Sequence, residues 1–326
     1  MEQLSICDLT PEQRFEGFLL VRMSAQRTGS NGAKYLDMIL ADRTGEVSSK
    51  LWDGNVPPPS VGEVVKVRGG TLEYNGRLQF RVEKLRSMMP SDAADVDMEL
   101  LTPCAPDKPE DMLAEIYAAV ADMDSKSLAK IVSELLRRYA EPLVYYPAAQ
   151  KIHHAERSGL LHHTTGMLKT AKAILPAYPW LNRDLVYAGV IVHDLCKIEE
   201  LDSDALGVVK DYTKSGLLLG HLVLGVERIG EAANALGIEG EPVTLLQHMM
   251  LSHHGEEAFG SPRKPMFPEA ELLHWLDLLD ARMNEMETAL GKVKPGVFTE
   301  KIWSLERRLY HPQYAQLSEQ TEAQKG

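Results

Sequence analysis

Hydrophobic periodicity changes once along this chain of 326 residues, and the change divides it into a β part and an α part. Between residues 16 and 86, apolar and polar residues alternate in short runs separated by Gly, Asn, Asp and Pro, which is typical of β-strands. From residue 111 onward, apolar residues recur at three- and four-residue spacing, which is typical of amphipathic helices. A chain of this length exceeds one average domain, so we expect two.

The first part predicts five strands that close into a small barrel. Asn75-Gly76 between the last two strands favours a type I′ hairpin turn, because both residues readily adopt left-handed backbone angles. The expected strands cover 15–27, 33–45, 46–54, 62–76 and 77–86.

The second part predicts an all-α domain. Eight helices are expected, at 111–123, 126–140, 162–175, 183–195, 218–236, 242–254, 268–290 and 300–309. The expected organisation is therefore a barrel domain at 1–90, a Pro- and Asp-rich linker at 91–110, a helical domain at 111–312 and a polar tail at 313–326.

Charge is distributed unevenly between the two parts. The net charge of −12 would argue against a nucleic-acid binder if it were spread over one body. However, residues 1–90 carry 12 Lys and Arg against 11 Asp and Glu, so the acidity belongs to the second part. Three widely spaced cysteines, a polar N-terminus and the absence of a long apolar run predict a cytoplasmic protein without a membrane segment.

All 11 histidines lie in the helical part, most of them in apolar-flanked segments. A single buried histidine is usually an ordinary core residue with one hydrogen-bond partner. Several together with aspartates form a donor set suited to Mn, Fe, Ni or Zn, and a bridging carboxylate lets two ions lie about 3.5–4 Å apart. The candidate segments hold His162, His163, His193, Asp194, His221, His253, His254 and Asp277.

The order His, His-Asp, His, His, Asp resembles the HD-domain superfamily of metal-dependent phosphohydrolases, an all-helical fold, over about residues 150–290. The resemblance implies that His163, His193, Asp194 and Asp277 are metal ligands. It assigns the ligands of a second ion to His221 and to one of His253 and His254. We favour His253 as the ligand and His254 as a group near the substrate, but the tandem leaves both open.

Two further residues near these ligands have expected roles. Lys197 matches the lysine of the superfamily's HDxxK pattern, where its charge would stabilise a phosphoryl oxygen beside Asp194. Asp280 shares a helix face with Asp277, and we expect it to support a ligand rather than to bind metal. His153, His154, His248 and His274 are expected to be structural, with the alternative that His153 and His154 of KIHH line the pocket near the first ligand.

The expected barrel, with its DRTGEV turn and LWD sequence, resembles the OB-fold, whose strands two and three hold single strands or oligosaccharides. Candidates for base stacking and phosphate binding are Tyr35, Trp52, Tyr74, Phe80, Arg22, Arg27, Lys34, Lys50, Arg77 and Arg81. About half of these aromatic residues could equally fill the barrel.

A barrel joined to an HD domain, with the segments AAQKIHH, SGLLHHT, HDLCKIEE, LLGHLVLG, LSHHGE, SPRKP and LLHWLDLLDARMN, resembles the YhaM-type 3′-5′ exoribonuclease family over almost the full length. Ser158 stands where this pattern has glycine, and His162 stands where it has glutamate. The resemblance implies two divalent ions, most plausibly Mn²⁺ with Fe, Co, Ni or Mg as alternatives. It also implies single-stranded RNA as substrate, with single-stranded DNA also possible, and 5′-mononucleotides as products. A homo-oligomer is possible.

Two other functions fit the same residues. A phosphohydrolase of small nucleotides or cyclic nucleotides would keep the metal ligands and leave the barrel without a role. A non-catalytic single-strand binder would keep the barrel and would not need the ligands.

Overall fold

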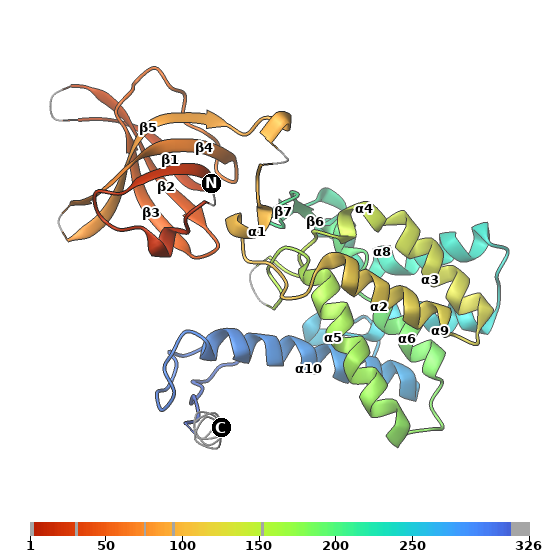
Figure 1. The fold of residues 1–326 in the computed structure, drawn as a ribbon. Coiled ribbons are helices and arrows are strands. Elements are labelled where there is room, and N and C mark those ends of the chain that lie inside the picture. The colour runs from red at the N-terminus through yellow and green to blue at the C-terminus, as the bar shows by residue number, and fades with distance from the viewer. Residues whose placement is uncertain (1–2, 30–31, 75, 93–94, 151–152, 314–326) are drawn as a thin grey trace, which may run out of the picture. The chain divides into compact units, whose positions relative to one another are not determined.

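The computed structural model describes residues 3–313 except 30–31, 75, 93–94 and 151–152. The chain forms two compact units, Met1–Cys104 and Ala105–Gly326, which are described separately (Figure 1). None of the helices in the described residues is long and apolar enough to cross a membrane.

The first unit is a closed five-stranded barrel with the strand order β1-β2-β3-β5-β4. β3 and β5 pair in parallel and the other neighbours are antiparallel, which is the Greek-key closure of the OB-fold. The strands are β1 (Arg14–Thr28), β2 (Lys34–Asp42), β3 (Gly45–Leu51), β4 (Val64–Tyr74) and β5 (Arg77–Ser87). The five predicted strands are therefore confirmed, whereas Asn75 of the predicted hairpin turn lies outside the described residues.

Alternation along each strand sorts the barrel side chains into inside and outside. Leu36, Met38 and Leu40 of β2 are fully buried, while the residues between them face outward. Phe80 of β5 is also fully buried and packs edge-on against Phe15. Phe80 therefore belongs to the barrel core, and the expectation that it could stack on a base is wrong.

The segment after β5 contains two short helices, η2 (Pro90–Asp92) and α1 (Met98–Leu101). Arg86 binds the carboxylate of Asp92 through two hydrogen bonds of 2.6 and 2.8 Å. The carbonyl oxygen of Leu100 accepts a hydrogen bond from the backbone N–H of Arg43. These contacts attach residues of the expected linker to the barrel.

The second unit is a bundle of helices packed around one apolar core. Side chains cap the N-termini of three helices: Ser125 accepts from Leu128 N, Asn182 from Leu185 N and Thr213 from Gly216 N. The helices are α2 (Pro109–Ala121), α3 (Lys126–Arg138), α4 (Ala140–Leu143), α5 (Gly159–Ile174), η3 (Leu175–Ala177), α6 (Arg183–Val192), α7 (Lys197–Glu200), α8 (Lys214–Ala235), α9 (Glu241–Ser252), η4 (Glu257–Phe259) and α10 (Pro268–Leu290).

Two details of this unit differ from the sequence-based expectation. A small antiparallel sheet, β6 (Leu201–Ser203) with β7 (Val209–Tyr212), interrupts the helices. Residues 300–309 are not helical; instead, isolated bridges pair Ile302 with Arg307 and Phe298 with Tyr310. Apolar spacing alone could not exclude a helix there; within 300–309 Leu305 is buried, whereas Trp303 is exposed.

Candidate metal centre

The predicted ligands lie on or directly after five helices of the second unit, α5, α6, α8, α9 and α10, which Figure 1 labels. His163 lies on α5, and His193 and Asp194 follow the C-terminal end of α6. His221 lies on α8, and Asp277 on α10. His253 and His254 directly follow α9.

The first group of ligand atoms consists of His163, His193 and Asp277. His163 Nε2 lies 3.2 Å from His193 Nε2 and 3.3 Å from Asp277 Oδ1. Both imidazoles are fully buried. Three donor atoms this close to one another can share one metal ion.

The second group consists of His221, His253 and His254. Asp194 faces both groups: its Oδ1 lies 3.4 Å from His221 Nε2 and 3.8 Å from His253 Nε2. Its Oδ2 lies 3.2 Å from His193 Nε2 and 3.7 Å from His163 Nε2. One carboxylate thus offers one oxygen to each group, which is the arrangement of a bridging ligand.

The orientation of four imidazoles is set by a bond at Nδ1. The Nδ1 atom of His163 lies 2.8 Å from Asp280 Oδ2, and that of His221 lies 2.8 Å from Glu200 Oε2. The Nδ1 atoms of His193 and His253 bind the carbonyl oxygens of Val190 and Met250 at 2.8 and 2.9 Å. Because the ring proton is on Nδ1 in these hydrogen bonds, Nε2 keeps a lone pair that can bind a metal ion, as in metal-ligating histidines.

Several of the inward-facing atoms take part in no hydrogen bond among the described residues. They are Asp194 Oδ1, His221 Nε2 and His253 Nε2, all of them buried, whereas Asp194 Oδ2 has the ammonium of Lys197 as its ion-pair partner. Burying a polar atom without a partner costs roughly 2–7 kcal/mol, and more for a charged atom. Divalent cations bound between these atoms would satisfy all of them, so the residues present fit a two-metal site.

Two glycines make room for this geometry. A Cβ atom on Gly166, one turn after His163 on α5, would lie 2.3 Å from Asp280 Oδ1. Gly220 (φ 69°, ψ 162°) is the non-helical point within α8 and directly precedes His221. The kink lets the backbone N–H of His221 donate to Glu200 Oε1 at 3.2 Å. Glu200 therefore binds both the backbone and the imidazole of His221.

Lys197 adds a positive charge beside the bridging carboxylate. Its Nζ lies 2.7 Å from Asp194 Oδ2 as an ion pair. Burial opposes both charged forms, but the pair outweighs it, so the pKa of Lys197 is raised and that of Asp194 is lowered well below its usual value. Both groups therefore stay charged at neutral pH.

The histidines of the centre differ in how readily they bind a proton. Burial lowers the pKa of His163, but hydrogen bonds to Asp277 and Asp280 outweigh it and raise the pKa to about 9. Burial and the neighbouring His254 hold the pKa of His253 well below its ordinary value. Metal binding must therefore displace a proton from His163, whereas His253 is already a neutral donor.

Sequence reasoning did not single out Glu200. The one hint in the sequence was that Glu199 and Glu200 follow closely after His193-Asp194. A pair of acidic residues on a short helix usually faces solvent, so it was not chosen. Asp280 lies as expected, supporting His163. His153 contacts the ring of His163 at 5.6 Å between centroids, and burial together with the charge of Lys197 lowers its pKa to about 3.

The structure explains how the two residues that depart from the family pattern, Ser158 and His162, are accommodated. Ser158 has φ 63°, in the left-handed region where glycine is favoured. His162 points away from the two ligand groups, and its Nδ1 lies 2.7 Å from Glu156 Oε1. His163 is therefore the member of that doublet that faces the metal centre, while both His253 and His254 reach the second group.

The barrel gathers most of its candidates on the outer face of β2, β3 and β5. Tyr35 stacks on the half-exposed Trp52, with ring centroids 4.6 Å apart, and Lys50 Nζ lies 5.4 Å from the Tyr35 ring. Lys50 and Arg81 are paired in register. Tyr74 and Arg77 line a nearby pocket with Ser48. Arg22 is exposed at the bulge of β1, Lys34 is exposed at the start of β2, and Arg27 is paired with Asp37.

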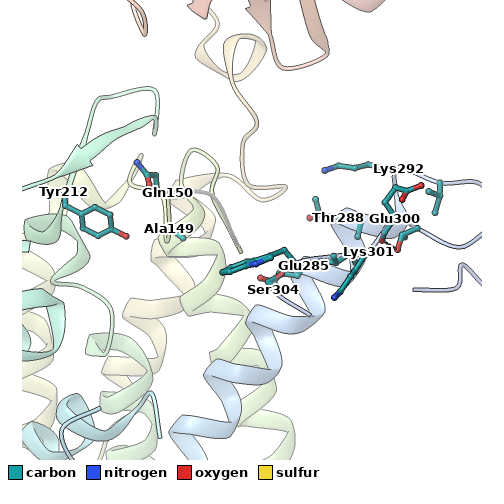
Figure 2. A pocket seen from close by; sticks show the side chains of 14 residues that line it. Ala149, Gln150, Tyr212, Glu285, Thr288, Lys292, Glu300, Lys301 and Ser304 are labelled. Atoms are coloured by element: carbon teal, nitrogen blue, oxygen red, sulfur yellow. Dashed lines mark hydrogen bonds between the residues drawn. The ribbon is translucent and has the colours of Figure 1, made fainter. Parts of the chain in front are cut away.

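A separate cavity of about 840 Å³ lies in the second unit and holds none of the predicted site residues. Figure 2 shows Tyr212 and Gln150 on one side, with Thr288, Lys292 and Lys301 on the other. Trp303, which is 84% exposed, also lines it. The α10 part of its wall begins at Glu285, a rise of about 12 Å from Asp277 on the same helix.

Comparisons with known proteins agree with this geometry. Residues 160–282 match the family model of the HD domain. The 3′-5′ exoribonuclease YhaM of Geobacillus sp. (strain WCH70) is 44% identical over 302 residues, 92% of each chain. That of Oceanobacillus iheyensis is 40% identical over 303 residues, 92% of this chain and 94% of the relative.

Two solved structures match about a quarter of the chain. A solution structure of the second OB-fold domain of replication protein A from Methanococcus maripaludis has a TM-score of 0.23 at 18% identity, over 26% of this chain and 93% of its own. A crystal structure of a domain of the same protein has a TM-score of 0.24 at 20% identity, over 27% and 97%. On the two full-length relatives and the HD match, this chain belongs to the family of the 3′-5′ exoribonuclease YhaM.

Proposed function

We propose that the protein is a metal-dependent 3′-5′ exoribonuclease that hydrolyses single-stranded RNA to 5′-mononucleotides. The observation that carries the proposal is Asp194, which lies between two groups of metal-donor atoms with one oxygen toward each. The full-length similarity to two exoribonucleases supports the choice of substrate. The donor set of imidazoles and carboxylates favours Mn²⁺, with Fe, Co, Ni or Mg as alternatives.

The ligands would be His163, His193 and Asp277 for one ion, and His221, His253 and His254 for the other, with Asp194 shared. When bound, two such ions supply an activated water at neutral pH and neutralise charge on the phosphate. The chain supplies the rest. Asp280 and Glu200 hold the imidazoles in the donating tautomer.

Lys197 is the protein's own cation at the reacting phosphate. Its ammonium stays protonated beside Asp194, so it can stabilise negative charge on a phosphoryl oxygen. Burial lowers the pKa of His254, which is therefore neutral at pH 7. A neutral imidazole next to the second group can serve either as a ligand or as a base toward the substrate.

The barrel would hold the upstream strand on its outer face. The Tyr35–Trp52 stack offers an exposed indole to a base, with Lys50 and Arg81 beside it for phosphates. Stacking contributes about 1–3 kcal/mol per base and tolerates any sequence. The same face tolerates deoxyribose, so single-stranded DNA is a possible second substrate.

We extend the proposal to the cavity of Figure 2, which we infer takes a nucleotide of the strand. Trp303 gives it an exposed aromatic face, and its charged lining consists of two lysines, Lys292 and Lys301, and two glutamates, Glu285 and Glu300. Its wall shares α10 with Asp277. We assign it to a base of the RNA strand close to the reacting phosphate.

The test is incubation of 5′-labelled single-stranded RNA with the purified protein and Mn²⁺. A ladder that shortens from the 3′ end, with 5′-mononucleotides as product, is expected. Asp194→Asn should abolish the ladder, and a matched DNA strand measures the preference for the sugar. Cleavage at internal positions, or hydrolysis of free or cyclic nucleotides alone, would contradict the proposal. We propose a cytoplasmic location, where such RNA is present, while homo-oligomerisation stays a prediction.

A further inference from the structure

A second cluster of metal-donor atoms lies beside the metal centre but outside its two groups. It consists of His154, Glu156 and His162, and we call it the His-Glu-His cluster. His154 Nδ1 lies 3.1 Å from His162 Nδ1. Glu156 Oε1 lies 2.7 Å from His162 Nδ1 and 3.6 Å from His154 Nδ1.

These spacings suit one small ion. Around a tetrahedral ion with bonds of about 2.0–2.1 Å, ligand atoms lie about 3.3 Å apart. The three donor atoms of the cluster span 2.7–3.6 Å. The first group of the metal centre has the same character, since His163 Nε2 and His193 Nε2 are 3.2 Å apart. In both places two imidazole nitrogens and a carboxylate oxygen converge.

The orientation of His154 matches that of the metal-centre histidines. Its Nε2 lies 2.7 Å from Asp280 Oδ2, which leaves Nδ1 as the lone-pair donor toward the cluster. The backbone holds it there: His154 has φ 48°, and its N–H donates to Asn284 Oδ1 at 3.0 Å. Its carbonyl oxygen would lie 2.0 Å from a Cβ atom on Gly159, so the close approach needs glycine.

We propose that the His-Glu-His cluster is a third divalent-cation site, with Zn²⁺ as the ion that fits it best. Two histidines and one glutamate form a donor set that zinc uses with water as fourth ligand. The His162 and Glu156 side chains are 26% and 20% exposed, so water reaches the site. Burial raises the pKa of Glu156, but hydrogen bonds from His154 and His162 outweigh it and lower the pKa, so Glu156 stays charged.

Occupation of this site is linked to the metal centre through one carboxylate oxygen. Asp280 Oδ2 accepts from both His154 Nε2 and His163 Nδ1. An ion on His154 would make its N–H a stronger donor and draw Asp280 away from His163. By linkage, ions at the two places change each other's affinity equally.

The test counts bound zinc in the full-length protein. Metal-free protein is dialysed to equilibrium against buffered free Zn²⁺, and zinc per chain is measured by mass spectrometry. Glu156→Gln and His162→Gln should each bind one zinc ion fewer than the unaltered protein. Co²⁺ titration should show, in the unaltered protein alone, an additional visible absorption band of a four-coordinate ion.

The matched control is His311→Gln, which removes an imidazole that belongs to neither place and should leave the count unchanged. Melting temperatures check that the variants fold. Equal counts in the unaltered protein and both variants would overturn the proposal, because the cluster would then be hydrogen-bonded only. Loss of more than one ion per variant would also overturn it, because the cluster would then merely support the metal centre. Neither readout uses RNA, so the result is independent of the proposed exoribonuclease activity.

Discussion

The barrel and the helical bundle bury opposite kinds of side chain. In the barrel the interior is apolar, and buried polar residues such as Asp42 and Thr71 are hydrogen-bonded to their neighbours. In the bundle, Asp194 Oδ1 and two imidazole nitrogens are buried without such bonds. The barrel uses its interior for stability and its outer face for contact, whereas the bundle gives up stability at its centre to hold ions.

The largest expected effect is at Asp194, which tests whether the interior of the bundle holds catalytic ions. Asp194→Asn removes the charge shared by both groups, and we expect a loss of at least about 10³-fold in kcat, since metal ions contribute several kcal/mol to the transition state. Single-turnover decay of labelled RNA measures this. The Kd for RNA should stay within a few-fold, because the barrel is untouched. Full activity in the variant would contradict the assignment.

Phe80 tests whether the interior of the barrel serves stability. Phe80→Ala should lower the free energy of unfolding by about 3–5 kcal/mol, because it leaves a cavity in a packed core. Calorimetry of the full chain measures the shift. Tyr74→Ala, at a side chain that is 59% exposed, is the matched control and should change stability by less than about 0.5 kcal/mol.

Asp280 separates support of a ligand from ligation itself. Asp280→Asn should weaken metal affinity about 10–100-fold, and saturating Mn²⁺ should restore most of the activity. Asp277→Asn removes a donor atom of the first group, so excess metal should not rescue it. Activity as a function of Mn²⁺ concentration measures both. Identical behaviour of the two variants would refute the distinction.

Trp52 tests contact on the outer face of the barrel. Trp52→Ala should raise the Kd for single-stranded RNA about tenfold, at the lower end of what stacking of one base contributes, and leave kcat unchanged. Trp180→Ala removes an exposed tryptophan from the helical unit and serves as the control. If both variants bind RNA equally well, the barrel face does not hold the strand.

The smallest effect concerns pH and the Arg86–Asp92 pair. The hydrogen bond from Arg86 holds the pKa of Asp92 well below its usual 3.8. A carboxyl whose pKa is lower in the folded than in the unfolded protein stabilises the fold fully above that usual value, and the contribution is lost as the pH falls from there through the folded-state pKa. Asp92→Asn should therefore lower the melting temperature slightly at pH 7 and by less at about pH 2. The melting temperature to compare is that of the barrel, which is recognised as the transition that shifts in Phe80→Ala. If Asp92→Asn lowered it equally at both pH values, the Arg86–Asp92 ion pair would not be the cause.

Periodicity and ligand order were sufficient to predict much of this protein. Alternation gave five strands close to their observed bounds, because a barrel strand has one buried face. The His, His-Asp, His, His, Asp order predicted residues that the structure brings together, because such side chains at the ends of apolar helices have few other roles. Residues 300–309 show the limit, since helical spacing there occurs without a helix.

What only the tertiary structure decided depends on contacts between distant segments. Phe80 and Tyr74 are both aromatic residues of neighbouring strands, and strand register and the barrel's closure decided that one is core and the other exposed. The resemblance had already selected His163 over His162, and the tertiary structure adds the physical reason, because the direction of each ring is fixed by a carboxylate, Glu156 or Asp280. Sequence determines which chemical groups the chain carries and which faces are apolar. Packing determines which of those groups share one buried place, because burial and orientation are properties of the assembled helices.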